Sequence, residues 1–259
     1  MTTEASIDAS IVDVSQDWAL ACDVQQRFMQ GLDPAADALD YSAQCRQVQA
    51  LGGDCYDFVA LPDRRLAMAI GDASGKGLAA ALMMSNVQSS LRTAVLFTGN
   101  DAAAALTAVN RQAYASSLAN RYATLFYGVF DGATRTLRYV NAGHNPPMVI
   151  GRDGSVAWLE TGGAPVGMFA DWTYEEGVIQ LSPGDLVVAF TDGVIEAVNP
   201  AGEEWGVDGL LRVAALSGAE DADGVVRAVF ASLDEFSRGR QTDDATVAAL
   251  RVSCGAQAA

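Results

Sequence analysis

The sequence predicts an α+β domain in which hairpin-linked strands form sheets that helices cover. Two observations support this prediction. Short β-rich runs separated by turn residues recur between residues 41 and 252. One pair of helical segments interrupts these runs, and a second pair precedes the last strand. Many antiparallel connections, with the helices grouped between them, favour sheets covered by helices in a single domain.

The first expected element is an amphipathic helix at 18–30. Leu20, Val24 and Phe28 recur every four residues there, which predicts a helix with one buried face. We expect residues 1–40 to form a leader that contains this helix, and residues 41–254 to form the domain. The narrow apolar stripe allows the helix either to pack on the domain or to pair with a second subunit.

The remaining elements follow from turn residues and hydrophobic periodicity. Strands are expected at 41–49, 56–61, 65–70, 122–130, 136–141, 148–150, 155–159, 178–181, 186–190 and 245–252. Helices are expected at 78–97, 101–118, 207–216 and 225–236. Pro62-Asp63, Asp131-Gly132 and Pro183-Gly184-Asp185 mark turns, and these turns imply antiparallel connections.

Composition excludes several classes of protein. Thirty-two acidic and sixteen basic residues give a formal charge of -16, which disfavours binding to nucleic acid. Four scattered cysteines and a single histidine, His144, exclude a zinc knuckle or a multi-histidine zinc centre. Any metal must therefore rely on oxygen ligands, and magnesium or manganese is expected. Without an apolar run long enough for a membrane span or an export signal, we expect a cytoplasmic protein.

Four acidic motifs fall at the ends of predicted elements. They are centred on Asp54, Asp72, Asp192 and Asp243. Glycine next to an aspartate lets the backbone turn sharply and approach an ion closely, while an adjoining strand holds the carboxylate in place. For a single Asp-Gly pair a turn is the commoner interpretation, and we assign Asp131-Gly132 to a hairpin turn outside the site.

Five motifs in order along the chain resemble those of a known family. They are Gly52-Gly53-Asp54-Cys55-Tyr56-Asp57-Phe58, Gly71-Asp72-Ala73-Ser74-Gly75-Lys76-Gly77, Asn141-Ala142-Gly143-His144-Asn145-Pro146-Pro147, Thr191-Asp192-Gly193 and Asp243-Asp244-Ala245-Thr246. Together they resemble the SpoIIE/RsbU branch of the PPM, or type 2C-like, phosphatases from about residue 25 to residue 252. Five motifs in sequence are far more specific than any one of them.

The resemblance implies a four-layer α-β-β-α sandwich with two central antiparallel sheets and a site for two Mn²⁺ or Mg²⁺ ions. By position, Asp72 resembles the carboxylate that bridges both ions, and Asp54 a ligand of one. Asp192 and Asp243 resemble ligands of the other, and the backbone carbonyl of Ala73 is a further candidate. These four aspartates are the expected catalytic residues.

Two interpretations are open for each of four other residues in these motifs. Asp57 and Asp244 either bind a metal-bound water or an extra ion, or are solvated or capping carboxylates. His144 is either catalytic or structural. Lys76 either neutralises substrate phosphate or extends into solvent.

The resemblance also implies a function. It predicts a serine/threonine protein phosphatase that uses a metal-activated water, with a STAS-type anti-sigma-factor antagonist as the expected substrate. An activator protein or a second copy of the chain is expected to bind through the N-terminal helix. The alternatives are a non-catalytic binding module of the same fold, and a nucleotide cyclase suggested only by Gly52-Gly53-Asp54.

Overall fold

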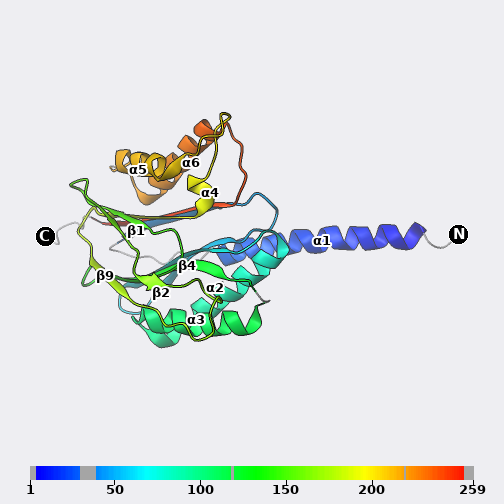
Figure 1. Ribbon diagram of the computed structural model, residues 1–259, viewed down its shortest axis with the longest axis horizontal. Helices are drawn as coiled ribbons and strands as arrows, with labels where there is room; N and C mark the ends of the chain where they lie inside the picture. The colour runs from blue at the N-terminus through cyan, green and yellow to red at the C-terminus, as the bar shows by residue number, and fades with distance from the viewer. Residues whose placement is uncertain (1–3, 30–38, 118–119, 219, 254–259) are drawn as a thin grey trace.

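The computed structural model describes residues 4–29, 39–117, 120–218 and 220–253. Two β-sheets pack face to face, and helices cover the outer face of each sheet, so the domain has four layers (Figure 1). This arrangement confirms the predicted α-β-β-α sandwich. The first helix, α1, extends away from the layers (Figure 1).

The helices and strands have the following bounds. The helices are α1 (Glu4–Met29), α2 (Leu78–Thr98), α3 (Ala102–Ser116), α4 (Asp192–Ile195), α5 (Gly206–Leu216) and α6 (Ala222–Ser237). The strands are β1 (Leu39–Arg46), β2 (Asp54–Leu61), β3 (Arg65–Ala73), β4 (Ala123–Asp131), β5 (Thr136–Ala142), β6 (Met148–Ile150), β7 (Val156–Trp158), β8 (Gly162–Gly163), β9 (Gly177–Gln180), β10 (Leu186–Phe190) and β11 (Ala245–Val252).

Nearly all strand pairs are antiparallel. One sheet has the order β1-β11-β10-β6-β7, and the other has the order β2-β3-β4-β5-β8, with β9 also paired to β5. The two hairpins predicted at Pro62-Asp63 and Asp131-Gly132 are present as β2–β3 and β4–β5. The short β8 runs parallel to β5 and was not predicted.

Side-chain alternation along each strand separates three apolar layers. In β3, Leu66, Met68 and Ile70 face the opposite sheet, whereas Ala67 and Ala69 face the helices α2 and α3. The same alternation in β11 separates residues that face the sheet of β2, β3, β4 and β5 from those that face α5 and α6. Which layer a strand residue reaches is therefore fixed by whether its position is odd or even.

One connection differs from the predicted one. The Pro183-Gly184-Asp185 turn was predicted to join antiparallel neighbours, but it joins β9 in one sheet to β10 in the other. The hydrophobic pattern of each strand is the same in either case, so the turn signal could not distinguish a hairpin from a crossover. Helix α2 is present as predicted, and it exposes Leu82 and Phe97 on its outer face.

The N-terminal helix is longer than predicted and its apolar stripe is not buried. Leu20 and Val24 are 61% and 54% exposed, and only the last turn of α1 lies against the domain, where Gln25 and Met29 are buried. The prediction of a buried Leu20, Val24 and Phe28 face is therefore wrong for the first two residues. The predicted end of the helix at residue 30 lies outside the described residues.

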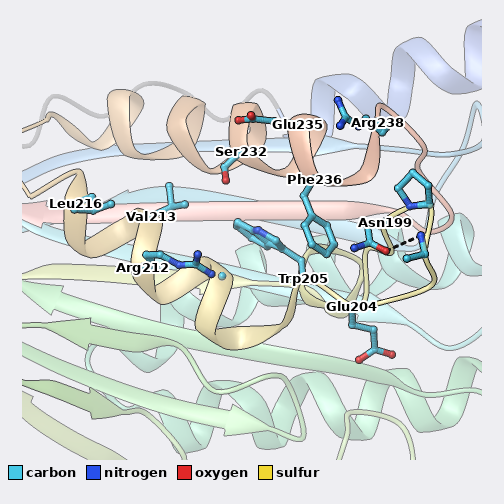
Figure 2. A pocket seen from close by; sticks show the side chains of 13 residues that line it. Asn199, Glu204, Trp205, Arg212, Val213, Leu216, Ser232, Glu235, Phe236 and Arg238 are labelled. Carbon is cyan, nitrogen blue, oxygen red and sulfur yellow. Dashed lines mark hydrogen bonds between the residues drawn. The ribbon is translucent and has the colours of Figure 1, made fainter.

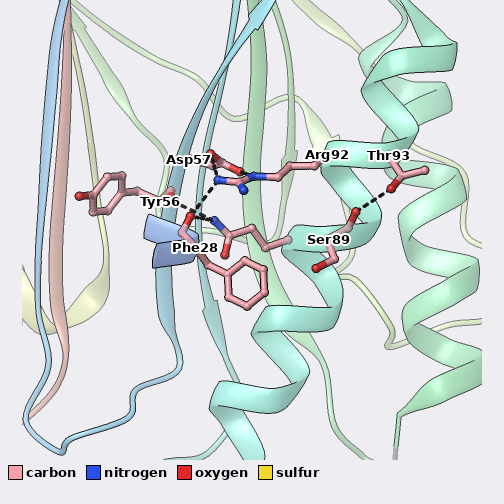
Figure 3. A network of polar contacts seen from close by, with 7 residues as sticks. Phe28, Tyr56, Asp57, Ser89, Arg92 and Thr93 are labelled. Carbon is pink, nitrogen blue, oxygen red and sulfur yellow. Dashed lines mark hydrogen bonds and ion pairs between the residues drawn. The ribbon is translucent and has the colours of Figure 1, made fainter. Parts of the chain in front are cut away.

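Polar contacts hold the last turn of α1 against the domain. The backbone carbonyl oxygen of Phe28 accepts hydrogen bonds from Arg92 Nη2 at 2.8 Å and from Gln88 Nε2 at 2.9 Å (Figure 3). A cationic side chain is favourable there because the C-terminal end of a helix carries partial negative charge. Gln25 also exchanges two hydrogen bonds with the backbone of Gly52, at 2.8 and 3.2 Å.

A search of the described helices finds none with the length and apolar character that a membrane span requires.

Candidate metal centre

Two of the predicted ligands lie side by side on neighbouring strands. Asp54 at the start of β2 is the direct cross-strand partner of Asp72 near the end of β3. Directly opposed residues in an antiparallel pair have Cβ atoms about 4.5–5.5 Å apart and point to the same face. That face is the one turned toward the opposite sheet, because Phe58, four residues after Asp54, and Ile70, two residues before Asp72, belong to the layer between the sheets.

Asp54 is linked to the opposite sheet through two threonines. Its Oδ2 accepts hydrogen bonds from Thr191 Oγ1 at 2.7 Å and from Thr246 Oγ1 at 2.6 Å. Thr191 follows β10 directly, and Thr246 lies in β11. The carboxylate is only 2% exposed, so these two hydroxyls supply donors that water cannot. Asp54 is therefore held in one orientation by both sheets.

The other two predicted ligands come from the ends of β10 and β11. Asp192 is the first residue of the short helix α4, which follows Thr191, and Asp243 precedes β11 by two residues. The two segments touch, because a Cβ placed on Gly193 would lie 2.0 Å from the backbone oxygen of Asp244 and 3.3 Å from Asp243 Cβ. Only glycine allows this approach. Gly193 therefore brings the Asp192 and Asp243 segments together.

A second glycine allows the two strand motifs to approach one another. A Cβ on Gly53 would lie 3.0 Å from the carbonyl oxygen of Ala73 and 3.1 Å from Asp72 Oδ1. The Ala73 amide also donates to the Gly53 carbonyl at 3.2 Å. The absent side chain of Gly53 thus leaves the Ala73 carbonyl and the Asp72 carboxylate close to the start of β2.

Burial and mutual repulsion raise the pKa values of the strand aspartates. Burial, with the charges of Asp244 and Asp192 adding to it, raises the pKa of Asp54 to about 7, although the hydroxyls of Thr246 and Thr191 oppose the shift. Burial, followed by repulsion from Asp54, Asp192 and Asp243, raises the pKa of Asp72 to about 8. Burial and Asp243 also raise the pKa of Asp192. The single cation beside the cluster, Lys76, therefore does not balance the four carboxylates.

The donor set fits a hard divalent cation. It contains four carboxylates and a nearby backbone carbonyl, which are the ligand types that Mg²⁺ and Mn²⁺ prefer. Within the described ranges, however, no three Asp, Glu, His or Cys side chains are arranged so that they could hold an ion. Asp54 Oδ2 is bonded to two threonines and Asp243 Oδ2 to Lys76. The individual ligand assignments therefore remain predictions.

Asp57 does not face the aspartate cluster. It lies three positions after Asp54 in the same strand, so its side chain points to the opposite face of the sheet, toward α2. There Arg92 donates to both of its carboxylate oxygens, at 2.6 and 2.9 Å (Figure 3). The odd spacing between the two aspartates could have shown this from the sequence. Asp57 is a buried ion-pair partner, which neither of the earlier interpretations described.

Asp244 holds the loop that leads into β2. Its Oδ1 accepts from the Val48 amide at 2.8 Å, and its Oδ2 accepts from the Gly53 amide at 3.0 Å. Because both oxygens bind backbone amides, the structure favours the capping interpretation over a role at a metal-bound water.

His144 and Lys76 occupy different environments. His144 is buried, its Nδ1 is 2.9 Å from Thr124 Oγ1, and burial lowers its pKa to about 4. A neutral, buried ring bonded to a neighbouring strand favours the structural interpretation. Lys76 does not simply extend into solvent, because its Nζ lies 2.7 Å from Asp243 Oδ2.

Sequence reasoning missed Thr191 and Thr246 as site residues. Both stood inside motifs that were identified for their aspartates, and each is one or two residues from an acidic residue in the Thr191-Asp192 and Asp244-Ala245-Thr246 segments. A β-branched hydroxyl residue is ordinary in a strand, so its type alone gives no signal. Their position on the inward face, set by strand alternation, could have revealed them.

The large clefts lie elsewhere. One of about 860 Å³ is formed by α5, α6 and the loop before α5, with Trp205, Arg212 and Phe236 among its walls (Figure 2). Another of about 600 Å³ is lined by Tyr114, Arg121 and Phe169, among others. None of the predicted ligands lines either cleft, so cavity size alone would not have located the aspartates.

The raised carboxylate pKa values predict a pH dependence of stability in the metal-free protein. Folding takes up protons between the ordinary aspartate pKa of 3.8 and the folded values of about 7 and 8. The free energy of unfolding must therefore fall as pH rises through that window. We expect the melting temperature in chelator to fall between pH 5 and pH 8, and to fall less steeply for Asp72→Asn, measured by differential scanning calorimetry. Equal slopes for the two proteins would contradict the assigned burial of Asp72.

Comparison with known proteins identifies the family. A family model described as Stage II sporulation protein E (SpoIIE) matches residues 62–253. Protein IcfG of Synechocystis is 30% identical over 218 residues, which are 73% of this chain and 34% of IcfG. Phosphoserine phosphatase RsbU of Bacillus subtilis is 28% identical over 242 residues, 92% of this chain and 71% of RsbU. The chain thus spans about a third of one relative and less than three quarters of the other.

Solved structures show the same fold. The RsbU and RsbW domains of Rv1364c from Mycobacterium tuberculosis align with a TM-score of 0.71 at 28% identity, covering 85% of this chain and 61% of that one. The SiaA-PP2C domain of Pseudomonas aeruginosa aligns with a TM-score of 0.80 at 21% identity, covering 95% and 99%. With the matched family model and the fold in agreement, the chain belongs to the SpoIIE family, within the SpoIIE/RsbU-like branch of the PPM phosphatases.

Proposed function

We propose that this chain is a metal-dependent protein phosphatase that hydrolyses phosphoserine or phosphothreonine. The observation that supports this most is the convergence of Asp54, Asp72, Asp192 and Asp243 from the ends of four elements in two sheets. Family membership points the same way, and RsbU and RsbP of Bacillus subtilis are both named phosphoserine phosphatases. The domain is proposed to span residues 41–254, and a cytoplasmic location stays a prediction from sequence.

The ligand assignment follows from where each carboxylate lies. The charges of Asp54, Asp192 and Asp243 all act on Asp72, so we assign it as the carboxylate that would contact two ions. Asp54 would serve one ion, its orientation fixed by Thr191 and Thr246, and the Ala73 carbonyl lies next to it. Asp192 and Asp243 would serve the other. A crystal structure grown with manganese tests each assignment.

The reaction needs positive charge that the cluster does not itself provide. Two bound Mn²⁺ or Mg²⁺ ions would lower the pKa of a shared water and neutralise the phosphoryl oxygens. The catalytic domain of PstP, which has the same fold at 18% identity and a TM-score of 0.62, was solved with two manganese ions. In this chain the aspartates would orient the ions and the attacking water. No protein nucleophile and no covalent phosphoenzyme are then required.

The central test is the substitution Asp72→Asn, which keeps the shape of the side chain and removes its charge. We expect it to lower hydrolysis of p-nitrophenyl phosphate with Mn²⁺ by about 100-fold or more, because the bridging carboxylate holds both ions. Chelation of the wild-type protein should abolish activity, and added Mn²⁺ or Mg²⁺ should restore it.

Asp131→Asn is the matched control for this test. Asp131 also precedes a glycine, but its Oδ1 accepts hydrogen bonds from the Ala133 and Thr134 amides in the β4–β5 turn. This variant should keep nearly full activity. Undiminished turnover in Asp72→Asn would contradict the proposed mechanism.

The proposed physiological substrate is a phosphorylated STAS-type anti-sigma-factor antagonist. Support comes from the family resemblance and from the similarity to RsbU. The exposed aspartate end of the sandwich suits a protein substrate, because Asp243 is accessible to solvent.

A panel of purified phosphoproteins tests the substrate proposal. We expect a STAS domain phosphorylated on serine to be hydrolysed with a kcat/KM at least tenfold above that of an unrelated phosphoserine protein. Phosphotyrosine substrates should be poor. Equal rates on all phosphoserine proteins would contradict the STAS assignment and leave the phosphatase proposal intact.

The exposed face of α1 is proposed to contact a second copy of the chain. Leu20 and Val24 are four residues apart and exposed, on a helix of 26 residues that extends beyond the sandwich (Figure 1). A helix face of this kind is self-complementary across a two-fold axis. An activator protein is the alternative occupant.

Sedimentation velocity decides between these occupants of α1. We expect the wild-type protein to dimerise and the double substitution Leu20→Glu with Val24→Glu to be monomeric, because buried glutamates at the interface would lose hydration. Phe97→Glu, on an exposed position of α2, is the control and should still dimerise. A monomeric wild-type protein would favour an activator instead.

A non-catalytic binding module of the same fold remains the alternative function. It would be supported by replacement of the metal-site aspartates, and all four are present in this sequence.

A further inference from the structure

Lys76 is the only lysine in the sequence. The other fifteen basic residues are arginines, out of sixteen lysines and arginines in total. Lys76 stands between Gly75 and Gly77 in the loop that follows Asp72 and Ala73, immediately before α2. A lysine in this loop is an exception, because every other positively charged side chain of this acidic protein is an arginine.

The Lys76 ammonium group is bonded to a predicted metal ligand. Its Nζ lies 2.7 Å from Asp243 Oδ2, and its charge also acts favourably on Asp192 and Glu196. Arg121 lies near the same loop, but its Nη1 donates to the Ser74 carbonyl at 2.6 Å. Among the described residues, Lys76 is the cation that is paired directly with the aspartate cluster.

This ion pair is exposed and therefore weak. The side chains of Lys76 and Asp243 are 58% and 42% exposed, and exposed pairs contribute little to stability because water screens them. Lysine is a compact charge on a flexible stem, so its ammonium group can move without a change in the backbone. A stronger competitor for Asp243 Oδ2 can thus displace it.

A divalent cation and an ammonium group cannot both bind the same carboxylate oxygen favourably. Both are positive, and at contact distance their repulsion is large compared with the weak exposed pair. Binding of a divalent ion at Asp243 must therefore remove Lys76 from that oxygen, and the loss of the pair reduces the affinity for the ion.

We propose that Lys76 is an internal competitor of the divalent cation at Asp243, and that it sets the metal affinity of this side of the site. The inference rests on the proposed function, because it takes Asp243 as a metal ligand. In the metal-free protein the ammonium group neutralises Asp243. When a divalent ion binds, Lys76 is released toward solvent, and the affinity for the ion is lower than the four carboxylates alone would give.

Isothermal titration calorimetry of Mn²⁺ into the metal-free full chain, at fixed pH and ionic strength, tests the proposal. Lys76→Gln should bind Mn²⁺ about tenfold more tightly than the wild type, because one competing charge is gone. Lys76→Arg keeps a cation and should stay within about twofold of the wild type.

Arg138→Gln is the matched control. It removes one positive charge from an ion pair of similar length away from the aspartates, Arg138 Nη1 to Glu176 Oε1 at 2.6 Å, with Arg138 half-exposed in the middle of β5. It changes the net charge by the same amount as Lys76→Gln and should leave the Mn²⁺ affinity within about twofold. An equal gain in affinity for both glutamine variants would overturn the proposal, since net charge alone would then explain it.

A spectroscopic readout follows Lys76 itself. Reductive methylation with ¹³C-formaldehyde keeps the positive charge and labels Lys76 and the N-terminal amine, which give two NMR signals. Mg²⁺ should shift the Lys76 signal with the same midpoint as the calorimetric titration. In Asp243→Asn without metal, the signal should already lie near its Mg²⁺-bound position.

The outcomes separate this inference from the proposed function. Wild-type protein that binds no Mn²⁺ or Mg²⁺ would overturn both. Wild-type and Lys76→Gln proteins that bind Mn²⁺ with equal affinity would overturn the inference alone. If Lys76→Gln instead raises only the KM for a phosphate ester, Lys76 serves the substrate and the inference is also overturned.

Discussion

The buried Asp54 carboxylate is where the two sheets and the aspartate cluster meet. It belongs to one sheet by its backbone and to the other by the hydroxyls of Thr191 and Thr246. A buried charge without partners is costly, so Asp54 can be retained only while both sheets keep their alignment at this end. Correct packing of the sandwich and correct geometry of the cluster are therefore the same condition.

Two hydroxyl donors do not fully compensate this charge. Asp72 lies directly opposite Asp54 on the next strand, and like charges in that position destabilise a sheet. Asp192 and Asp243 add further repulsion from the other sheet. The domain thus keeps an arrangement that weakens its own fold, which is typical of a site whose geometry serves binding rather than stability. The Asp57–Arg92 pair shows the contrast, because there each charge has its partner within the protein.

Much of this fold could be predicted from the sequence because its signals are local. The Pro62-Asp63 and Asp131-Gly132 turns fix two hairpins, as predicted, and Asp101 caps α3 by accepting from the Ala104 amide. Features that depend on contacts between distant parts of the sequence could not be predicted. The chain crosses between sheets at Pro183-Gly184-Asp185 with the same residues that would make a hairpin, and β8 consists of two glycines with no side chain to form a pattern.

The candidate site, too, could be predicted from the sequence only in part. Glycine next to aspartate marks three of the four acidic segments, those of Asp54, Asp72 and Asp192. How near the four segments lie to one another depends on the fold. Strand alternation alone places Asp57 on the outer face of its sheet, because it lies three residues after Asp54 in the same strand. The exposure of the Leu20–Val24 stripe could not be predicted, because periodicity indicates that a helix has an apolar face but not what covers that face.

The way α1 is attached has a consequence for local opening of the protein. Its last turn is held by hydrogen bonds from Arg92 and Gln88, by those between its own Gln25 and Gly52, and by few buried apolar groups, so its detachment exposes little apolar surface. Such a segment opens at a lower free energy than the core strands. Gln25 forms hydrogen bonds with both the amide and the carbonyl of Gly52, which precedes Gly53 and Asp54. Each detachment of α1 therefore also breaks the hydrogen bonds of Gly52. Amide protons of α1 and of the loop before β2 should then exchange with solvent together, ahead of the sheets.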